Sequence, residues 1–206
     1  MIPVIVVALV VYARTLAPTL TWGHHGSDGG DLVTAVATAG VPHPTGYPTY
    51  TLLGRLFLLI PWGDAAHRIN LMSAVFAALA AGLLYLILLR TFRLFKAQPP
   101  GLTARFAAAA ALSFAFAPLF WSQAVIAEVY TLNAFFIALV IYLVLRWMER
   151  PDVRVLSAAA LACGLGMGNH VTIVLLVPAL LALLAEEVRH LGKLLEKSSP
   201  KSLAQT

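Results

Sequence analysis

The sequence predicts an all-α membrane protein whose helices cross the bilayer several times. Of its 206 residues, 60% are hydrophobic and only 11% are charged, whereas a soluble domain carries roughly a quarter charged residues. Several apolar runs approach the roughly 20 residues that a helix needs to cross a bilayer. Most lysines and arginines stand at the ends of these runs, as topology signals do. These observations together predict an integral membrane protein built as a multi-spanning helix bundle.

The positive charge and the single cysteine exclude two other classes. The formal net charge is +5, but the basic residues flank apolar segments, so we expect no nucleic-acid partner. Cys163 stands within an apolar run and has no second cysteine to pair with. The chain therefore has no disulfide framework and no cysteine-based metal site.

Residues 22–48 form a long polar interruption early in the chain. This stretch contains Asp28, Asp31 and three of the six histidines. Ser27 or Asp28 can cap a helix that runs to Gly40, with Asp31 in its first turn. The prolines that follow predict a stiff loop, because proline fixes its own φ and restrains the preceding residue. We therefore expect the first extracytoplasmic loop to be helical in part.

The rest of the chain is a series of apolar segments separated by short polar reversals. Residues 49–62 are too short to span a membrane and contain Arg55, which predicts an interfacial helix. Residues 155–185 predict two short spans joined at residues 168–170, with one long kinked helix as the alternative. The remaining expected spans are residues 2–21, 71–89, 106–126 and 129–145.

This pattern predicts one membrane domain and a tail. Residues 1–185 would contain about six spans plus the interfacial helix, with residues 22–70 as the first outer loop. Residues 186–206 would form a polar cytoplasmic tail. Three segments, at residues 90–105, 146–154 and 189–201, hold eleven of the 14 lysines and arginines. The positive-inside rule then places these segments, the tail and the N-terminus in the cytoplasm.

This orientation brings chemically capable side chains to the outer face. They come from the first loop, from the reversal before residue 129 and from residues 168–170, and the cytoplasmic turns have no comparable set. We therefore expect any site to be extracytoplasmic. Its candidate residues are Asp28, Asp31, His43, Tyr47, Gln123, Glu128, Tyr130, Asn169 and His170.

Four ordered blocks of sequence carry a resemblance to a known family. They read SDGGDLVTAVATAGVPHPTGYPTYTLLGRLF, RINLMSAVFAAL, FWSQAVIAEVYTLNAFF and GMGNHVT. Together they resemble a prokaryotic membrane family of long-unassigned function that is related to the eukaryotic transmembrane protein O-mannosyltransferases. That family belongs with the GT-C glycosyltransferases, and the resemblance covers roughly residues 15 to 180.

The resemblance implies a GT-C-type transmembrane helix bundle and a glycosyltransferase activity. Such enzymes move a sugar, here a hexose such as mannose, from a polyprenyl-phosphate carrier to a protein or glycan hydroxyl outside the cytoplasm. It also implies an integral protein of a prokaryotic plasma membrane. The family pattern Asp-Ser-Gly-Glu stands here as Asp-Gly-Gly-Asp at residues 28–31, so the second acid is one methylene shorter. Family members are generally longer, which leaves a short paralogue or an N-terminal module as readings of this chain.

The resemblance implies a catalytic acid in the first outer loop. Asp28 is the candidate general base, against the simpler reading of a helix cap. Asp31 is the second catalytic candidate; it could align the acceptor, bind a divalent cation with Asp28, or only place negative charge at a helix N-terminus. The spacing of nearby histidines matches no strong ligand motif, so no metal ligand is assigned.

The other candidates are substrate-binding residues, each with a structural alternative. His43 could contact the donor or hold its own loop, and Tyr47 could pack at the membrane interface. Glu128 could bind sugar or pair with Arg55 or Arg68. Gln123 and Tyr130 could be ordinary interfacial residues. Asn169 and His170 could contact the donor phosphate or cap helix ends.

Two further classes of function stand beside the transferase. A transporter or lipid-handling membrane protein would also use a broken hairpin and intramembrane charges. The candidate residues, however, gather at one face and the sequence has no internal repeat. A non-catalytic N-terminal module of a larger transferase is the other alternative.

Overall fold

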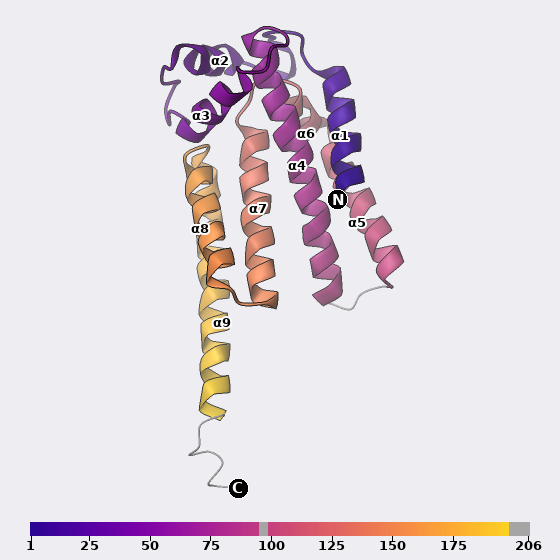
Figure 1. Cartoon of the computed structure of the whole chain (residues 1–206), viewed down its shortest axis with the longest axis vertical. Coiled ribbons are helices and arrows are strands. Elements are labelled where there is room, and N and C mark those ends of the chain that lie inside the picture. The colour runs from indigo at the N-terminus through magenta and orange to yellow at the C-terminus, as the bar shows by residue number, and fades with distance from the viewer. Residues whose placement is uncertain (95–98, 198–206) are drawn as a thin grey trace. The chain divides into compact units, whose positions relative to one another are not determined.

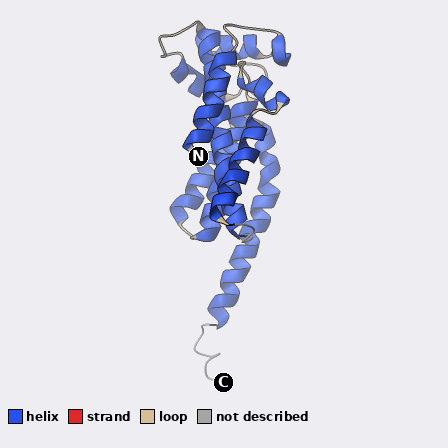
Figure 2. Cartoon of the chain, turned by 90° about the vertical axis from the view of Figure 1, so that its right-hand side faces the viewer, coloured by secondary structure: helices blue, strands red, loops and turns tan. Residues whose placement is uncertain are grey.

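The computed structural model describes residues 1–94 and 99–197 and is built from helices and loops over that part of the chain (Figure 2). The expected all-α fold is confirmed. The chain divides into two compact units, Met1–Ile173 and Val174–Thr206. Residues 198–206 of the expected polar tail lie outside the described residues.

The first unit contains eight α-helices among the described residues. Helix α4 packs against α1, α5 and α7, and α8 packs against α7 (Figure 1). The short helices α2 and α3 lie at one end of this bundle. The α-helices are α1 (Ile2–Thr15), α2 (Gly29–Thr38), α3 (Pro48–Phe57), α4 (Ala65–Leu94), α5 (Pro100–Ala115), α6 (Pro118–Ala124), α7 (Tyr130–Glu149) and α8 (Val153–Met167).

The described residues also form two short 3₁₀ segments and one further helix. The first segment, Gly23–His25, precedes α2. The second, Val171–Leu176, follows α8, and helix α9 (Val177–Lys197) belongs to the second unit. Within α9, Arg189 and Glu186 form an ion pair one turn apart, at 2.7 Å.

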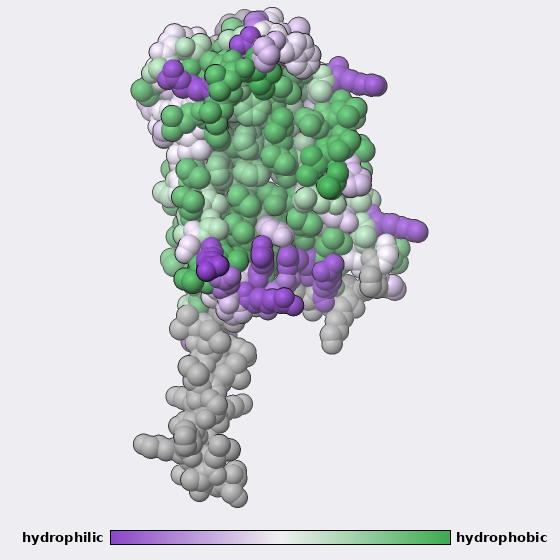
Figure 3. Space-filling view, in the orientation of Figure 1, coloured by the Kyte–Doolittle hydropathy of each residue, from purple (hydrophilic) through white to green (hydrophobic). Residues whose placement is uncertain are grey.

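Among the residues that the structure describes, two helices are long and apolar enough to cross a membrane. They are α4, over Ala65–Arg93, and α7, and the pair α5–α6 would be a third span if it crosses as one broken element. Three shorter apolar helices cover Ile2–Thr15, Val153–Met167 and Val171–Glu186. A broad hydrophobic face covers the bundle, with hydrophilic residues gathered at its lower end (Figure 3). The chain is accordingly an integral membrane protein.

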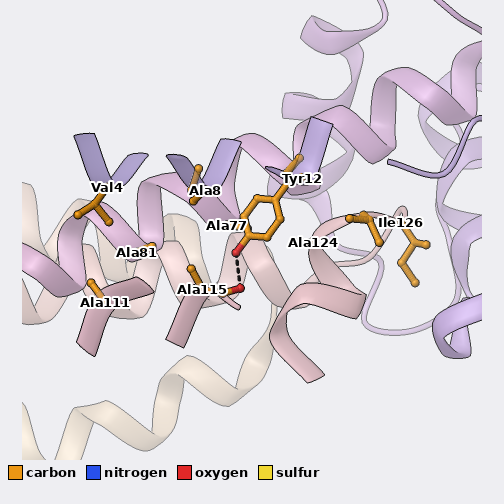
Figure 4. Packing of buried hydrophobic residues seen from close by; sticks show 12 residues of the cluster. Val4, Ala8, Tyr12, Ala77, Ala81, Ala111, Ala115, Ala124 and Ile126 are labelled. Atoms are coloured by element: carbon orange, nitrogen blue, oxygen red, sulfur yellow. Dashed lines mark hydrogen bonds between the residues drawn. The ribbon is translucent and has the colours of Figure 1, made fainter. Parts of the chain in front are cut away.

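The core between α1, α4 and α5 consists mainly of small side chains. Ala8, Ala77, Ala81 and Ala111 are fully buried there, which lets the helix backbones approach closely (Figure 4). Tyr12 crosses this core, and its hydroxyl donates a hydrogen bond to the carbonyl of Ala115 at 2.6 Å. Since a bilayer offers no water to this hydroxyl, the bond also satisfies a buried polar group.

The segment expected as one span at residues 106–126 is not a single straight helix but a bent pair of helices. Helices α5 and α6 meet at an angle of 67°. The cause is Pro118 at the start of α6, because proline disfavours a helical conformation at the preceding residue. Ala117 accordingly adopts φ −59° and ψ 131°. This bend forms one wall of the cavity described below.

Several other boundaries differ from those expected. The interfacial helix expected at residues 49–62 is present as the shorter α3, and α4 begins within the expected joint at residues 63–70. Helix α1 ends at Thr15, before Pro18. Helix α2 begins at Gly29 as expected, but the left-handed residue at its end is Ala39, with φ 60°, rather than Gly40.

The expected break at residues 168–170 is confirmed. Helix α8 ends at Met167, and the amides of Asn169 and His170 donate back to the carbonyl of Gly166. The Thr49 amide donates to the Gly168 carbonyl at 3.0 Å, and the Thr49 hydroxyl donates to Leu165 at 2.7 Å. These bonds fix the end of α8 against the start of α3.

Replacing glycine by alanine should have opposite effects on stability at two positions of α8. A Cβ at Gly166 would lie 3.0 Å from the Cβ of Phe136 and would also press on Ile173, whereas no described residue comes within 4 Å of a Cβ at Gly164. We expect Gly166→Ala to lower the free energy of unfolding by about 1–3 kcal/mol. Gly164→Ala should raise it by up to about 1 kcal/mol, because alanine favours a helix. Thermal unfolding in detergent measures both, and equal effects would contradict this packing.

Candidate functional site

The candidate residues gather where α2, α3 and the reversals before α7 and after α8 meet. In Figure 1 this is the end of the bundle that carries α2 and α3. The sequence assigns these residues to three separate reversals, and the bundle brings side chains from all three into contact. The contacts below run from Asp28 to His43, from Tyr47 to His170 and from His170 to Tyr130.

Asp28 occupies the N-cap position of α2, but its side chain makes no capping hydrogen bond. Only its carbonyl enters the helix, accepting from the Leu32 amide at 2.9 Å. One carboxylate oxygen accepts from the Ser27 hydroxyl at 3.2 Å, and the other lies 3.8 Å from Nε2 of His43. Asp28 is therefore the N-cap residue of α2 by position, but its carboxylate faces other groups.

Asp31 holds His43 through two hydrogen bonds to one oxygen. Its Oδ2 accepts from the backbone amide of His43 at 2.8 Å and lies 2.7 Å from the ring Nδ1. The backbone bond and then the ring bond lower the pKa of Asp31, so it is a carboxylate at neutral pH. An ionised Asp31 requires the proton on Nδ1 of His43, since a carboxylate can only accept.

His43 therefore joins the two acids and passes the contact on to Tyr47. Its Nε2 lies 3.0 Å from the Tyr47 hydroxyl, and the two rings meet edge to face at 5.1 Å. With the proton on Nδ1, Nε2 accepts a hydrogen bond from that hydroxyl. Burial, followed by the negative charge of Asp28, raises the pKa of Tyr47 and keeps it protonated.

Beyond His43, three aromatic rings contact one another in sequence: Tyr47, His170 and Tyr130. Tyr47 stacks on His170 with ring centroids 6.3 Å apart, and His170 lies 5.6 Å from Tyr130. Nδ1 of His170 accepts from the Thr172 amide at 3.3 Å. Burial lowers the pKa of His170, which favours its neutral form. Tyr47 itself is the N-cap residue of α3 and has φ 41°, in the left-handed region that residues other than glycine rarely adopt.

A cavity of about 670 Å³ opens beside Asp28. One side is polar, and the other is apolar and comes from the bend between α5 and α6. Ligand sites of this size commonly combine apolar walls with a few placed polar groups. The polar lining is Ser27, Asp28, Gln123, Glu128 and Tyr130, and the apolar lining is Phe114, Ala117, Leu119 and Phe120.

Glu128 lines this cavity but is only 2% exposed. Its Oε2 has no hydrogen-bond partner among the described residues. Burial, and then the charge of Asp28, raises the pKa of Glu128 to about 7. The expected alternative of a pair with Arg68 is wrong, since that guanidinium donates to the carbonyls of Trp62, Leu58 and Gly63 instead.

Gln123 and Asn169 are the two buried amides of the set. Gln123 lines the cavity and donates to the His24 carbonyl at 3.1 Å. Asn169 is fully buried and donates to the Val129 carbonyl at 3.1 Å, which fixes the reversal that carries Glu128 and Tyr130. Asn169 thus lies behind the site, whereas Gln123 faces into it.

A metal site receives no support from the described side chains. Within the part of the chain that the structure describes, no group of three or more His, Cys, Asp or Glu residues could hold an ion. The carboxylates of Asp28 and Asp31 both contact the ring of His43, and they do not face a shared space in which an ion could lie.

The sequence did not indicate the apolar wall of the cavity or the residues that contact the backbone of Glu128. Ser73 exchanges hydrogen bonds with the backbone of Glu128, at 3.3 and 3.4 Å, and is buried. Phe114 and Phe120 enter the cavity lining only because the helix bends between them. Pro118, inside an apolar run, was the signal that could have indicated this bend.

The family described as "Protein O-mannosyl-transferase TMEM260 N-terminal domain" matches residues 28–190. The chain belongs to this family. Its membership confirms the resemblance to O-mannosyltransferase-like proteins drawn from the four sequence blocks, and the GT-C relationship is consistent with it.

Two curated relatives of the TMEM260 family are similar to most of the chain. Protein O-mannosyl-transferase TMEM260 of Mus musculus is 37% identical over 172 residues, covering 81% of this chain and 23% of the relative. Protein O-mannosyl-transferase tmem260 of Dictyostelium discoideum is 28% identical over 185 residues, covering 82% and 21%. The chain thus spans less than a quarter of these relatives. No solved structure matches it.

Proposed function

We propose that this chain carries the donor and acceptor site of a GT-C-type protein O-mannosyltransferase. The donor is mannose on a polyprenyl-phosphate carrier, and the acceptor is a hydroxyl of a protein or glycan. Two relatives with this activity in their names support the class of reaction. The carrier is proposed from the apolar wall beside the polar lining, which suits a prenyl chain next to a sugar phosphate.

The observation that carries this proposal is that the carboxylate of Asp28 lines the cavity and makes no capping hydrogen bond to α2. A helix cap would be occupied by backbone amides, whereas this carboxylate has an oxygen that a hydroxyl can approach. A general base must reach the proton that it removes. Asp28 meets that condition for any acceptor hydroxyl that enters the cavity.

The proposed reaction is a single displacement at the anomeric carbon. The acceptor oxygen bonds to that carbon while the bond from carbon to the phosphate oxygen breaks. The electron pair leaves with the phosphate, and the hydroxyl proton moves to Asp28. Positioned general bases typically contribute about 10²–10⁴-fold to such a step.

The other residues have positioning and binding roles in this proposal. Asp31 orients His43, which stands beside Asp28 and Tyr47. Gln123, Glu128 and Tyr130 contact the sugar from the polar lining, since each could donate a hydrogen bond to a hydroxyl. His170 contacts the leaving phosphate, and Asn169 supports the reversal from behind.

The proposed topology places this site outside the cytoplasm. The arginines at residues 90, 93, 146 and 150 lie at the other end of α4 and α7, as the positive-inside rule requires of a cytoplasmic end. We accordingly propose residues 1–185 as the membrane domain, with the N-terminus and the tail from residue 186 in the cytoplasm. The membrane would be a prokaryotic plasma membrane.

The short coverage of the relatives favours one second candidate. Since the chain spans 23% of the mouse relative, it could act as a non-catalytic N-terminal module of a larger transferase. Such a module would bind the donor through the same cavity without completing the transfer.

Transfer of radiolabelled mannose tests the two candidates. Membranes that contain the chain are given polyprenyl-phosphate mannose, polyprenyl-phosphate glucose or a nucleotide-linked mannose, with a serine- and threonine-rich acceptor protein. We expect label in the acceptor from polyprenyl-phosphate mannose above that from membranes without the chain. Donor binding without transfer would favour the module, and transfer only from the nucleotide sugar would contradict the proposed carrier.

A further inference from the structure

A second cavity lies at the end of the bundle opposite the candidate site. Its volume is about 440 Å³. It lies where α4 and α7 end and α8 begins, so it is at the C-terminal, polar ends of the two long apolar helices. Figure 1 shows these helix ends. Its polar lining consists of Arg90, Arg93, Arg146, Glu149, Arg150 and Asp152.

Among the described residues, only one of these arginines forms an ion pair with a carboxylate. Arg90 pairs with Glu149, and its guanidinium lies 4.9 Å from the centre of the Tyr142 ring. Among the described residues, Arg93, Arg146 and Arg150 form no ion pair with a carboxylate. The cavity therefore has three guanidinium groups whose charges are not matched within the described part of the chain.

The two acidic side chains of this cavity already have partners within the protein. Glu149 is the partner of Arg90. Asp152 is the N-cap of α8, where its Oδ1 accepts from the backbone amide of Arg154 at 2.8 Å. The lining therefore has a net positive charge and several guanidinium donors directed at one space, an arrangement that suits a phosphate group.

We propose that this cavity binds the phosphate of an anionic phospholipid headgroup. Guanidinium groups bind phosphate with two parallel hydrogen bonds, and basic pockets between membrane helices hold such headgroups. A lipid, rather than free phosphate, fits the position, because acyl chains could lie along the apolar faces of α4 and α7 directly above the cavity. This site is separate from the donor site proposed above, which lies at the other end of the same helices.

The test measures lipid affinity of the detergent-solubilised chain by native mass spectrometry. The probes are dioctanoyl-phosphatidylglycerol, dioctanoyl-phosphatidylcholine and inorganic phosphate. We expect phosphatidylglycerol to bind at least about tenfold more tightly than either of the others. The double variant Arg146→Gln/Arg150→Gln should weaken it roughly 30-fold, since each basic residue near a membrane surface contributes about fivefold, or about 1 kcal/mol.

A matched control removes the same charge outside the cavity. Arg105 and Arg154 are exposed and do not line it. Arg105→Gln/Arg154→Gln should change the affinity by no more than about threefold. Equal weakening by both double variants would overturn the proposal in favour of diffuse charge attraction. So would equal binding of the two lipids to the unchanged chain, a comparison that needs no folded variant. Phosphate bound as tightly as phosphatidylglycerol would overturn the assignment to a lipid.

Discussion

Asp28→Asn should reduce mannosyl transfer by about 10²–10⁴-fold, because the variant loses the proposed base. The substitution keeps the size of the side chain, and asparagine still accepts the Ser27 hydroxyl bond. Since the Asp28 side chain does not cap α2, the fold should be unchanged. The measurement is label transfer from polyprenyl-phosphate mannose, with circular dichroism as the check on folding.

Asp31→Asn is the matched control for this experiment. It makes the same chemical change within one helical turn, but Asp31 acts on His43 rather than on the acceptor. Its side chain is 48% exposed, so the loss of a charge-assisted bond should cost about 1 kcal/mol, or roughly fivefold in rate. Equal losses in both variants, or full activity in Asp28→Asn, would show that Asp28 is not the base.

Glu128→Gln should remove a pH dependence of stability between pH 5 and 8. Burial, assisted by the charge of Asp28, raises the folded pKa of Glu128 from 4.5 to about 7. Between these values the folded chain holds a proton that the unfolded chain releases, so stability is full below pH 4.5 and falls as the pH rises to 7. The difference corresponds to about 3 kcal/mol, or roughly 5–10 °C in the unfolding midpoint.

Thermal unfolding in detergent at pH 5 and pH 8 measures this effect. The midpoint of the unchanged chain should fall by several degrees more than that of Glu128→Gln. Glu186→Gln is the control, because that side chain is 70% exposed and should leave the pH dependence as it is. Asp28→Asn should reduce the dependence, since it removes the second cause of the raised pKa. The same change in unfolding midpoint between pH 5 and pH 8 in all chains would contradict a raised pKa for a buried Glu128.

The sequence alone determined the fold class and the composition of the site. Apolar runs flanked by basic residues require a helical membrane protein, because lipid leaves no other way to satisfy the backbone. The polar residues Ser27 and Asp28 predicted the start of α2, and the glycines up to Gly168 predicted the break at residues 168–170. The reversals carry Asp28, His43, Glu128 and His170 whatever the packing, since polar residues are expelled from the apolar spans.

Only the tertiary structure decided which of these residues meet and in what state. The joining of both acids through His43 depends on how the loop between α2 and α3 folds back to the start of α2. Glu128 is buried only in the folded chain, where Ser73 of α4, 55 residues away in the sequence, bonds to its backbone carbonyl. Burial depends on neighbours that a local pattern does not contain. Pro118 marks the bend in the sequence, but only the folded chain shows that this bend forms the apolar wall of the cavity.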